Sequence, residues 1–113
     1  MVRKSDVLVA MSQTALDTHL RNLKETGTLI VDTDTIKEVP STSAKIFKAD
    51  ATKKAETELK SRMHANMVML GAIVKITKLV TNSSVEKAIQ ETFSGEAAEK
   101  NIKAFKAGLD LIK

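Results

Sequence analysis

The chain has 113 residues, a net charge of +4 and no cysteine, and 28% of its residues are charged. This length predicts one domain, residues 1–113, which buries roughly two thirds of the surface of the unfolded chain. Without cysteine the chain holds no disulfide, no thiolate zinc site and no iron–sulfur cluster of its own. The basic excess comes without Tyr or Trp, and the three Phe residues are not interleaved with Lys or Arg, so we expect a solvated surface rather than a nucleic-acid site.

Residues 6–11 (DVLVAM) form a continuous apolar run, which is typical of a central parallel strand covered on both faces by helices. Ser12 is predicted to cap a helix whose inner face carries Ala15, Leu16, His19, Leu20 and Leu23. Gly27 is predicted to end this helix, and residues 28–32 (TLIVD) form a second apolar strand. Residues 6–32 therefore predict one right-handed strand–helix–strand unit.

Asp32, Thr33 and Asp34 follow the second strand, at the edge where open α/β sheets usually bind ligands. Two carboxylates separated by one residue could share a cation or a proton. Asp and Thr are also ordinary loop residues that hydrogen-bond to their own backbone. We therefore expect a loop here, and we keep Asp32, together with Ser12, as a candidate binding residue.

Residues 44–49 (AKIFKA) predict a short strand whose lysines are exposed, as suits the edge of a sheet. Asp50 is predicted to cap a surface helix that runs to about Arg62. The next helix, residues 63–80, contains the uncharged run 65–74 (ANMVMLGAIV), which is too short for the roughly 20 apolar residues of a bilayer span. It is therefore predicted to be buried, and Gly71 in its middle indicates a close backbone approach.

Ser83 and Glu86 have the spacing of a capping box for a helix that ends at residues 94–95. The last helix has the most regular apolar face of the chain, made of Ala98, Ile102, Phe105, Leu109 and Ile112. The order of elements predicts an α/β fold with a small, mainly parallel sheet and helices on its faces. We describe it as a Rossmann-like three-layer fragment that ends in a helical C-terminal segment.

Residues with the chemistry of a catalytic or metal site are sparse. Neither His19 nor His64 has other donors at a metal-ligand spacing, so we expect both to be structural and no metal to be bound. No G-x-S-x-G elbow, G-x-G-x-x-G turn or P-loop occurs, and we assign no catalytic residue. Asn66 lies inside the apolar run. Its amide either caps the helix end or fixes the register between two packed helices, or it contacts a ligand or a partner.

Residues 62–74 (RMHANMVMLGAIV) resemble the A-N-M-v-x-L-G-A segment of the gamma subunits of 2-oxoacid:ferredoxin oxidoreductases. Residues 5–12 (SDVLVAMS) resemble the S-D-V-L-V-A-x-S segment of that family, and residues 27–32 (GTLIVD) resemble its G-G-x-L-I-V-D strand. Residues 99–105 (EKNIKAF) resemble its closing E-x-N-x-K-A-F helix. These four matches occur in the family order, and residues 65–71 are most similar to the 2-oxoglutarate branch.

The resemblance implies a noncatalytic assembly subunit of a complex that oxidatively decarboxylates a 2-oxoacid, makes an acyl-CoA and reduces ferredoxin. It implies that thiamine diphosphate and the iron–sulfur clusters are held mainly by other subunits or domains, that the alpha, beta and delta subunits are partners, and that CoA is a substrate. The G-x-G-G-Q-G turn near the start of family members has no counterpart here. The chain therefore resembles the C-terminal part of such a subunit, as a truncated or split gene product.

Two alternatives remain open from the residues alone. One is a free-standing module that binds a small anion, such as CoA or a nucleotide, where capped helices meet strand ends. The other is a homo-oligomer joined through an uncovered sheet edge. The sequence shows no secretory leader or membrane segment, so for each alternative we expect a cytoplasmic protein.

Overall fold

The chain divides into two compact units, residues 1–50 and residues 51–113, and the computed structural model describes residues 4–112 of it. The sequence analysis predicts a single domain and a three-layer arrangement. Both predictions depend on how the two units pack together, so both stay predictions. Between residues 4 and 112 no helix is long and apolar enough to cross a bilayer.

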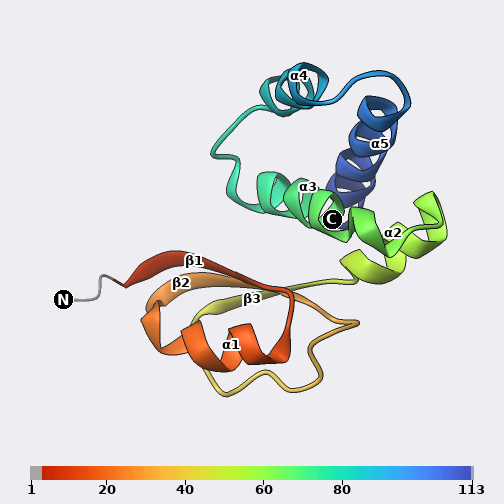
Figure 1. Cartoon of the computed structure of the whole chain (residues 1–113). Helices are drawn as coiled ribbons and strands as arrows, with labels where there is room; N and C mark the ends of the chain where they lie inside the picture. The colour runs from red at the N-terminus through yellow and green to blue at the C-terminus, as the bar shows by residue number, and fades with distance from the viewer. Residues whose placement is uncertain (1–3, 113) are drawn as a thin grey trace. The chain divides into compact units, whose positions relative to one another are not determined.

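The first unit is a three-stranded parallel sheet with a short helix against one face (Figure 1). Its elements are β1 (Ser5–Ala10), α1 (Gln13–His19), a 3-10 turn (Leu20–Asn22), β2 (Leu23–Asp32) and β3 (Lys45–Ala49). The strand order is β1-β2-β3, with Leu29 of β2 opposite Leu8 on one side and Ile46 on the other. The predicted parallel sheet is confirmed, and so is the position of residues 45–49 at its edge.

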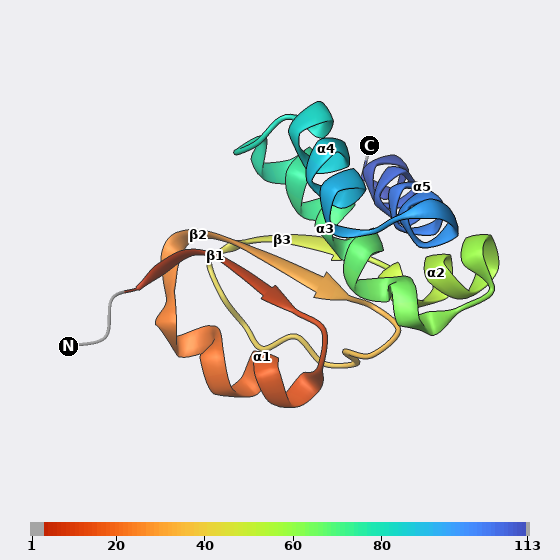
Figure 2. The same ribbon diagram turned by 45° about the horizontal axis from the view of Figure 1, so that its top comes forward.

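The core of this unit lies between α1 and the sheet. Figure 2 shows from a second direction that α1 lies on one face of the three strands. Leu29 and Val31 are two residues apart on β2, so their side chains point to the same face. Leu16 of α1 and Ile36 from the segment after β2 pack against them, and all four are buried. This burial holds α1 and the connection from β2 to β3 on one side of the sheet.

Three predictions for this unit are wrong. Residues 6–11 do not form a central strand, because β1 is an edge strand of the described sheet and β2 lies in the middle. Gly27 does not end a helix but lies within β2, which begins at Leu23. His19 is exposed at the end of α1, because the helix is too short to carry the predicted inner face as far as residue 23.

Gly27 is required for close packing at an irregularity between β1 and β2. Ser5 pairs with Leu23 whereas Val7 pairs with Thr28, so β2 contains extra residues between the two pairs. A Cβ added at Gly27 would lie 2.9 Å from the Asp6 carbonyl oxygen, closer than a Cβ normally approaches backbone. Gly27 therefore serves a bulged strand and not the end of a helix.

The second unit is helical. Its elements are α2 (Ala51–Leu59), a 3-10 turn (Arg62–His64), α3 (Ala65–Thr77), α4 (Asn82–Thr92) and α5 (Gly95–Leu111). Helices α3 and α5 lie side by side in both views (Figure 1, Figure 2), and Val74, Ile89 and Phe105 form a core between α3, α4 and α5. The prediction of a buried helix is confirmed for α3, where Gly71 meets the backbone of α5 at Phe105 and Gly108.

The helices of this unit are shorter than the sequence predicts. Helix α2 ends at Leu59 rather than near Arg62, and α3 covers residues 65–77 rather than 63–80. Lys60 and Lys78 adopt left-handed backbone conformations, with φ of 55° and 54°, directly after α2 and α3. A left-handed residue stops a helix, and lysine gives no sequence signal for one, because this conformation normally favours glycine.

The capping box predicted at Ser83 and Glu86 is also wrong. Helix α4 is capped by Thr81, whose Oγ1 accepts a hydrogen bond of 3.1 Å from the Ser84 amide. Glu86 does not turn back to the helix start, because its carboxylate pairs with Lys106 Nζ of α5 at 3.5 Å. Gly95 does not end α4 but begins α5, with φ of 55°.

Candidate functional site

The carboxyl ends of β1 and β2 lie next to each other, because Ala10 pairs with Val31 across the parallel ladder. The segments that leave these two strands are tied together by Thr35. Its Oγ1 is 2.7 Å from the Met11 carbonyl oxygen and 3.3 Å from the Asp32 carbonyl oxygen, and it donates to these acceptors. This is the edge at which parallel sheets usually bind ligands.

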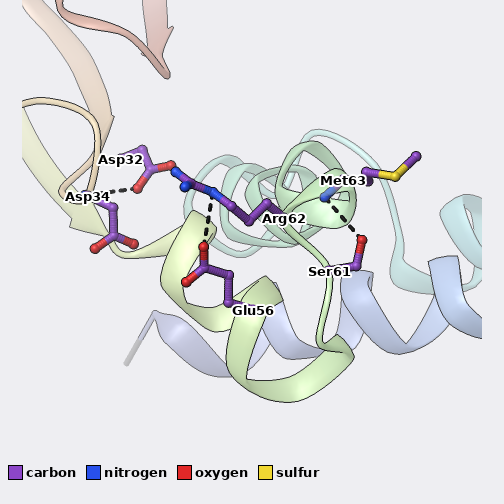
Figure 3. Close-up of polar contacts among 6 residues, drawn as sticks. All are labelled: Asp32, Asp34, Glu56, Ser61, Arg62 and Met63. Carbon is purple, nitrogen blue, oxygen red and sulfur yellow. Dashed lines mark hydrogen bonds and ion pairs between the residues drawn. The ribbon is translucent and has the colours of Figure 1, made fainter.

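Asp32 is fully buried and shapes the turn after β2. Its carboxylate oxygen Oδ1 accepts a hydrogen bond of 3.1 Å from the Asp34 amide (Figure 3). Its carbonyl oxygen accepts from the amides of Thr35 and Ile36 at 3.2 and 3.0 Å. These contacts agree with the expected loop, in which an aspartate hydrogen-bonds to nearby backbone. A binding role of Asp32 stays a prediction.

Ser12 caps α1 as predicted, since its Oγ accepts a hydrogen bond of 3.1 Å from the Ala15 amide. The side chain is exposed, and its known partner is the helix backbone. Helix α1 has only seven residues, which makes its dipole a weak source of anion binding. The structure therefore shows Ser12 as the cap of α1, and a role of Ser12 in binding stays a prediction.

Gln13 is one of two residues of this edge, with Thr35, that the sequence analysis missed. Its Nε2 donates to the Asp17 carboxylate at 3.1 Å and to the Glu38 carbonyl oxygen at 2.7 Å. Its Oε1 accepts from the amides of Lys37 and Glu38 at 3.1 and 3.2 Å. An amide side chain can make two donor and two acceptor bonds, so Gln13 uses its whole capacity to hold the segment after β2 against α1.

Beside Gln13 and the segment that it holds lies an open cleft of about 790 Å³, within the size range of small-molecule sites. It is lined by Gln13, Asp17, Thr35, Lys37, Glu38, Val39 and Pro40. Its charged side chains carry both signs, so the cleft suits a polar ligand without favouring an anion or a cation. The Gln13 amide already makes four hydrogen bonds within the protein, so its role in the structure is to position the wall of the cleft.

Nothing in the sequence identifies the partner of Gln13 in advance. A glutamine directly after a helix cap is compatible with an exposed helical side chain, and its bonds reach residues 24 and 25 positions further along the chain. The one usable signal is its location at the carboxyl edge of a predicted parallel strand. Thr35 was missed for the same reason, because its contact with Met11 also spans 24 positions.

Asn66 lies in the first turn of α3, in the unit of residues 51–113, whereas Ser12 and Asp32 belong to the unit of residues 1–50. Its side chain is exposed, although it lies within the apolar run. The helix turns Asn66 outward while its neighbours Ala65 and Val68 are buried. Because Asn66 is exposed, it does not fix the register of two packed helices from within their interface. A contact with a partner stays a prediction.

The residues just before α3 form short local contacts, which Figure 3 also shows. The Ser61 hydroxyl oxygen accepts a hydrogen bond of 3.2 Å from the Met63 amide, and Arg62 Nε pairs with the Glu56 carboxylate at 3.0 Å. His64 is half-buried and makes no side-chain capping hydrogen bond to α3. Over the described part of the chain, no cluster of three or more His, Cys, Asp or Glu side chains is arranged to hold a metal ion.

The sequence matches the family model described as pyruvate ferredoxin/flavodoxin oxidoreductase over residues 1–111. The chain belongs to this family. The oxidoreductase relatives include the 2-oxoglutarate synthase subunit KorC of Methanothermobacter thermautotrophicus, which is 40% identical over 117 residues, covering 98% of this chain and 62% of the relative. They also include the common gamma subunit of the pyruvate and ketoisovalerate oxidoreductases of Thermococcus litoralis, 39% identical over 91% of this chain and 59% of the relative.

The fold agrees with that of solved oxidoreductase family members. The gamma subunit of a keto/oxoacid ferredoxin oxidoreductase from Geobacter sulfurreducens superposes with a TM-score of 0.87 at 32% identity, covering 93% of this chain and 62% of the other. The predicted α/β class and the resemblance to oxidoreductase gamma subunits are thereby confirmed. The chain spans about three fifths of the length of the curated relatives it matches.

Proposed function

We propose that this chain serves as a noncatalytic part of the gamma subunit of a 2-oxoacid:ferredoxin oxidoreductase, with 2-oxoglutarate as the substrate of the complex. The observation that carries the proposal is the family match over residues 1–111. The 2-oxoglutarate branch is supported by coverage. The KorC relative aligns with 98% of the chain, against 91% for the pyruvate and ketoisovalerate subunit, at almost equal identity.

In this proposal the complex decarboxylates 2-oxoglutarate, transfers the acyl group to CoA and passes the electrons to ferredoxin. Iron–sulfur clusters are held by cysteine thiolates in most proteins, and this chain contains no cysteine. The residues present therefore do not fit a cluster. We assign the clusters and thiamine diphosphate to the alpha, beta and delta subunits and no reaction step to this chain.

The contribution of this chain is then one of assembly in the cytoplasm. Near the candidate site, the side chains of Gln13 and Thr35 stabilise the fold by hydrogen-bonding to the backbone of neighbouring segments. Asn66 is exposed in the first turn of α3, and we assign it a contact with a neighbouring subunit. Ser12 and Asp32 are assigned to shaping the edge beside the cleft, where the substrate or CoA would approach.

Co-expression tests the proposal. The tagged chain is produced with the alpha, beta and delta subunits of a 2-oxoglutarate synthase, and the purified material is assayed for ferredoxin reduction that depends on CoA and an oxoacid. We expect the four polypeptides to purify together and 2-oxoglutarate to be preferred over pyruvate and ketoisovalerate. Purification of the tagged chain without any other subunit would remove the assembly role, and a preference for pyruvate would remove the assignment to the 2-oxoglutarate branch.

An Asn66→Ala variant examines the assigned subunit contact. We expect it to fold as the unchanged chain does, because the side chain is exposed, and to retain less of the other subunits at the same salt concentration. Asn82→Ala is the matched control, because Asn82 is also an exposed asparagine at the start of a helix. Equal retention by both variants would show that Asn66 is not part of a subunit interface.

A further inference from the structure

The connection between α3 and α4 presents two neighbouring apolar side chains to solvent. Leu79 is 79% exposed and Val80 is 50% exposed, whereas the core residues between α3, α4 and α5 are buried. In both views the connection runs on the side away from α5 (Figure 1, Figure 2). Single exposed apolar residues are common on protein surfaces, but turns normally carry Gly, Asn, Asp or Ser. An adjacent aliphatic pair at a turn therefore needs a physical reason.

The connection after α2 shows that the backbone alone does not supply this reason. Lys60 and Lys78 both adopt a left-handed conformation directly after their helices. Lys60 is followed by Ser61, whose hydroxyl oxygen accepts a hydrogen bond of 3.2 Å from the Met63 amide. Lys78 is followed instead by the exposed, apolar Leu79. The same helix stop thus accepts a polar residue at the next position, and the apolar side chain at position 79 is not required by the turn.

Hydrogen bonds fix both ends of the α3–α4 connection. The Lys78 amide donates to the Val74 carbonyl oxygen at 2.8 Å and closes the last turn of α3. At the other end, Thr81 Oγ1 accepts from the Ser84 amide at 3.1 Å and donates to the Ser84 hydroxyl oxygen at 2.7 Å. Leu79 and Val80 lie between these two fixed points. Little conformational entropy is therefore lost when a partner covers them, which favours binding.

The surroundings of this apolar pair are basic. Residues 59–85 contain no Asp or Glu, and residues 51–113, with 11 Lys and Arg against 7 Asp and Glu, account for the whole net charge of +4. Lys75 and Lys78 are exposed, and within residues 4–112 neither forms an ion pair. Unpaired charges are costly inside a protein but are tolerated at the solvated rim of an interface. The two lysines therefore favour a docking surface with an acidic partner over a continuation of the core.

We propose that Leu79 and Val80 insert into an apolar pocket of another subunit of the oxidoreductase complex, and that carboxylates at the border of this pocket face Lys75 and Lys78. This inference rests on the proposed function, because the partner is taken from that complex. The two aliphatic side chains supply affinity, and the lysines speed association and orient the partner. A membrane is a weaker occupant, because a whole myristoyl chain gives only marginal membrane binding and these two side chains are smaller.

Photo-crosslinking identifies the occupant. The chain is co-expressed with the alpha, beta and delta subunits of a 2-oxoglutarate synthase and with a polypeptide containing the KorC residues outside the match. In one version Leu79 is replaced by p-benzoylphenylalanine, and in the control version Gln90, which is exposed on α4, is replaced. We expect the residue at position 79 to crosslink to the alpha, beta or delta subunit, at a peptide that contains apolar residues together with Asp or Glu. Position 90 should give no such product.

Matched variants measure the contribution of each part of the surface. The double change Leu79→Thr and Val80→Thr should retain about tenfold less of the crosslinked subunit, whereas Ile46→Thr, at another partly exposed aliphatic residue, should retain as much as the unchanged chain. Lys75→Glu should weaken association, less so at high salt, because salt screens exposed charges. Lys87→Glu on α4 is the charge control and should have no effect. Urea unfolding of each variant shows that it remains folded.

The possible outcomes separate the occupants. Crosslinking at position 79 to a second copy of this chain or to the KorC polypeptide overturns the inference, and so does equal crosslinking at positions 79 and 90. Co-sedimentation with phosphatidylglycerol vesicles that the double threonine variant abolishes would assign the surface to a membrane instead. If the other subunits purify equally with the unchanged chain and with the double variant, the proposed function stands and the docking contact fails. If no subunit purifies with the unchanged chain, the proposed function fails and the docking contact with it.

Discussion

Replacement of Gly71 by alanine tests how closely α3 and α5 approach each other. A Cβ added at this position would overlap the carbonyl oxygen of Phe105, and it would lie 2.8 Å from the Leu109 amide nitrogen and 2.9 Å from the Cα of Gly108. All three are backbone atoms of α5, so no side-chain rotation can make room. The two helices must separate, and this separation loosens the packing of Phe105, which is fully buried.

Two opposing effects set the magnitude of the Gly71→Ala change. Alanine favours a helix over glycine by about 1 kcal/mol. Forcing a methyl group into a packed interior costs about 1–3 kcal/mol, and we take the upper end because the obstacle is backbone. The net expectation is a loss of about 2 kcal/mol in the free energy of unfolding, which corresponds to a fall of about 8 °C in the melting temperature for a chain of this size.

Urea unfolding followed by circular dichroism at the helix band measures this loss. Gly108→Ala should lose a similar amount, because its Cβ would overlap the Val68 carbonyl oxygen from the other side of the same contact. The double variant should lose less than the sum of the two, since the first separation makes room for the second methyl group. Gly95→Ala is the control for backbone conformation without crowding, because its φ is 55° and no atom lies within 4 Å of the added Cβ. A Gly71→Ala chain that is more stable than the unchanged one would refute the close contact.

Three further changes address single hydrogen-bonding side chains. Gln13→Ala removes four hydrogen bonds and should lower the free energy of unfolding by about 1–3 kcal/mol. Amide hydrogen exchange at Lys37 and Glu38 should become faster, because their bonds to Gln13 are lost. Thr14→Ala, on the exposed side of α1, is the control and should change neither quantity. Thr81→Ala should cost about 1 kcal/mol by removing the cap of α4, and a larger loss for Ser83→Ala would restore the cap predicted from the sequence. Asp32→Ala should destabilise the turn after β2 by about 1 kcal/mol more than Asp32→Asn, which keeps the oxygen that accepts from the Asp34 amide. Equal unfolding energies for the two Asp32 variants would contradict that turn.

The elements of this fold could be predicted where the apolar pattern is strong. The strand 28–32, the edge strand 45–49, the buried helix around Gly71 and the face of the last helix that contains Phe105 all follow from the spacing of apolar residues. Element ends were predicted less well. Lys60 and Lys78 end helices by adopting left-handed conformations, and no local signal marks them, because this conformation normally favours glycine.

The candidate site could be predicted only as a location. The carboxyl edge of the strands and the capping by Ser12 follow from local rules, and the loop around Asp32 follows from the residue types at a turn. The contacts of Gln13 and Thr35 were not predictable, because their partners are 24 or 25 residues away along the chain. In the sequence, these two residues look like any other polar residue near the surface. The role of Asn66 was left open, since an apolar run does not reveal which of its members a helix turns outward.

By itself the sequence determined the family, the α/β class and the burial of the apolar run at residues 65–74, because these depend on the order and spacing of residue types. Only the tertiary structure decided that β1 is an edge strand, that Gly27 serves a bulge in β2, and that Gly71 and Gly108 form one helix contact. The physical reason is that strand neighbours and helix contacts join residues far apart in the chain. Local patterns specify what a segment can bury, whereas the partner that buries it is fixed only when the chain folds.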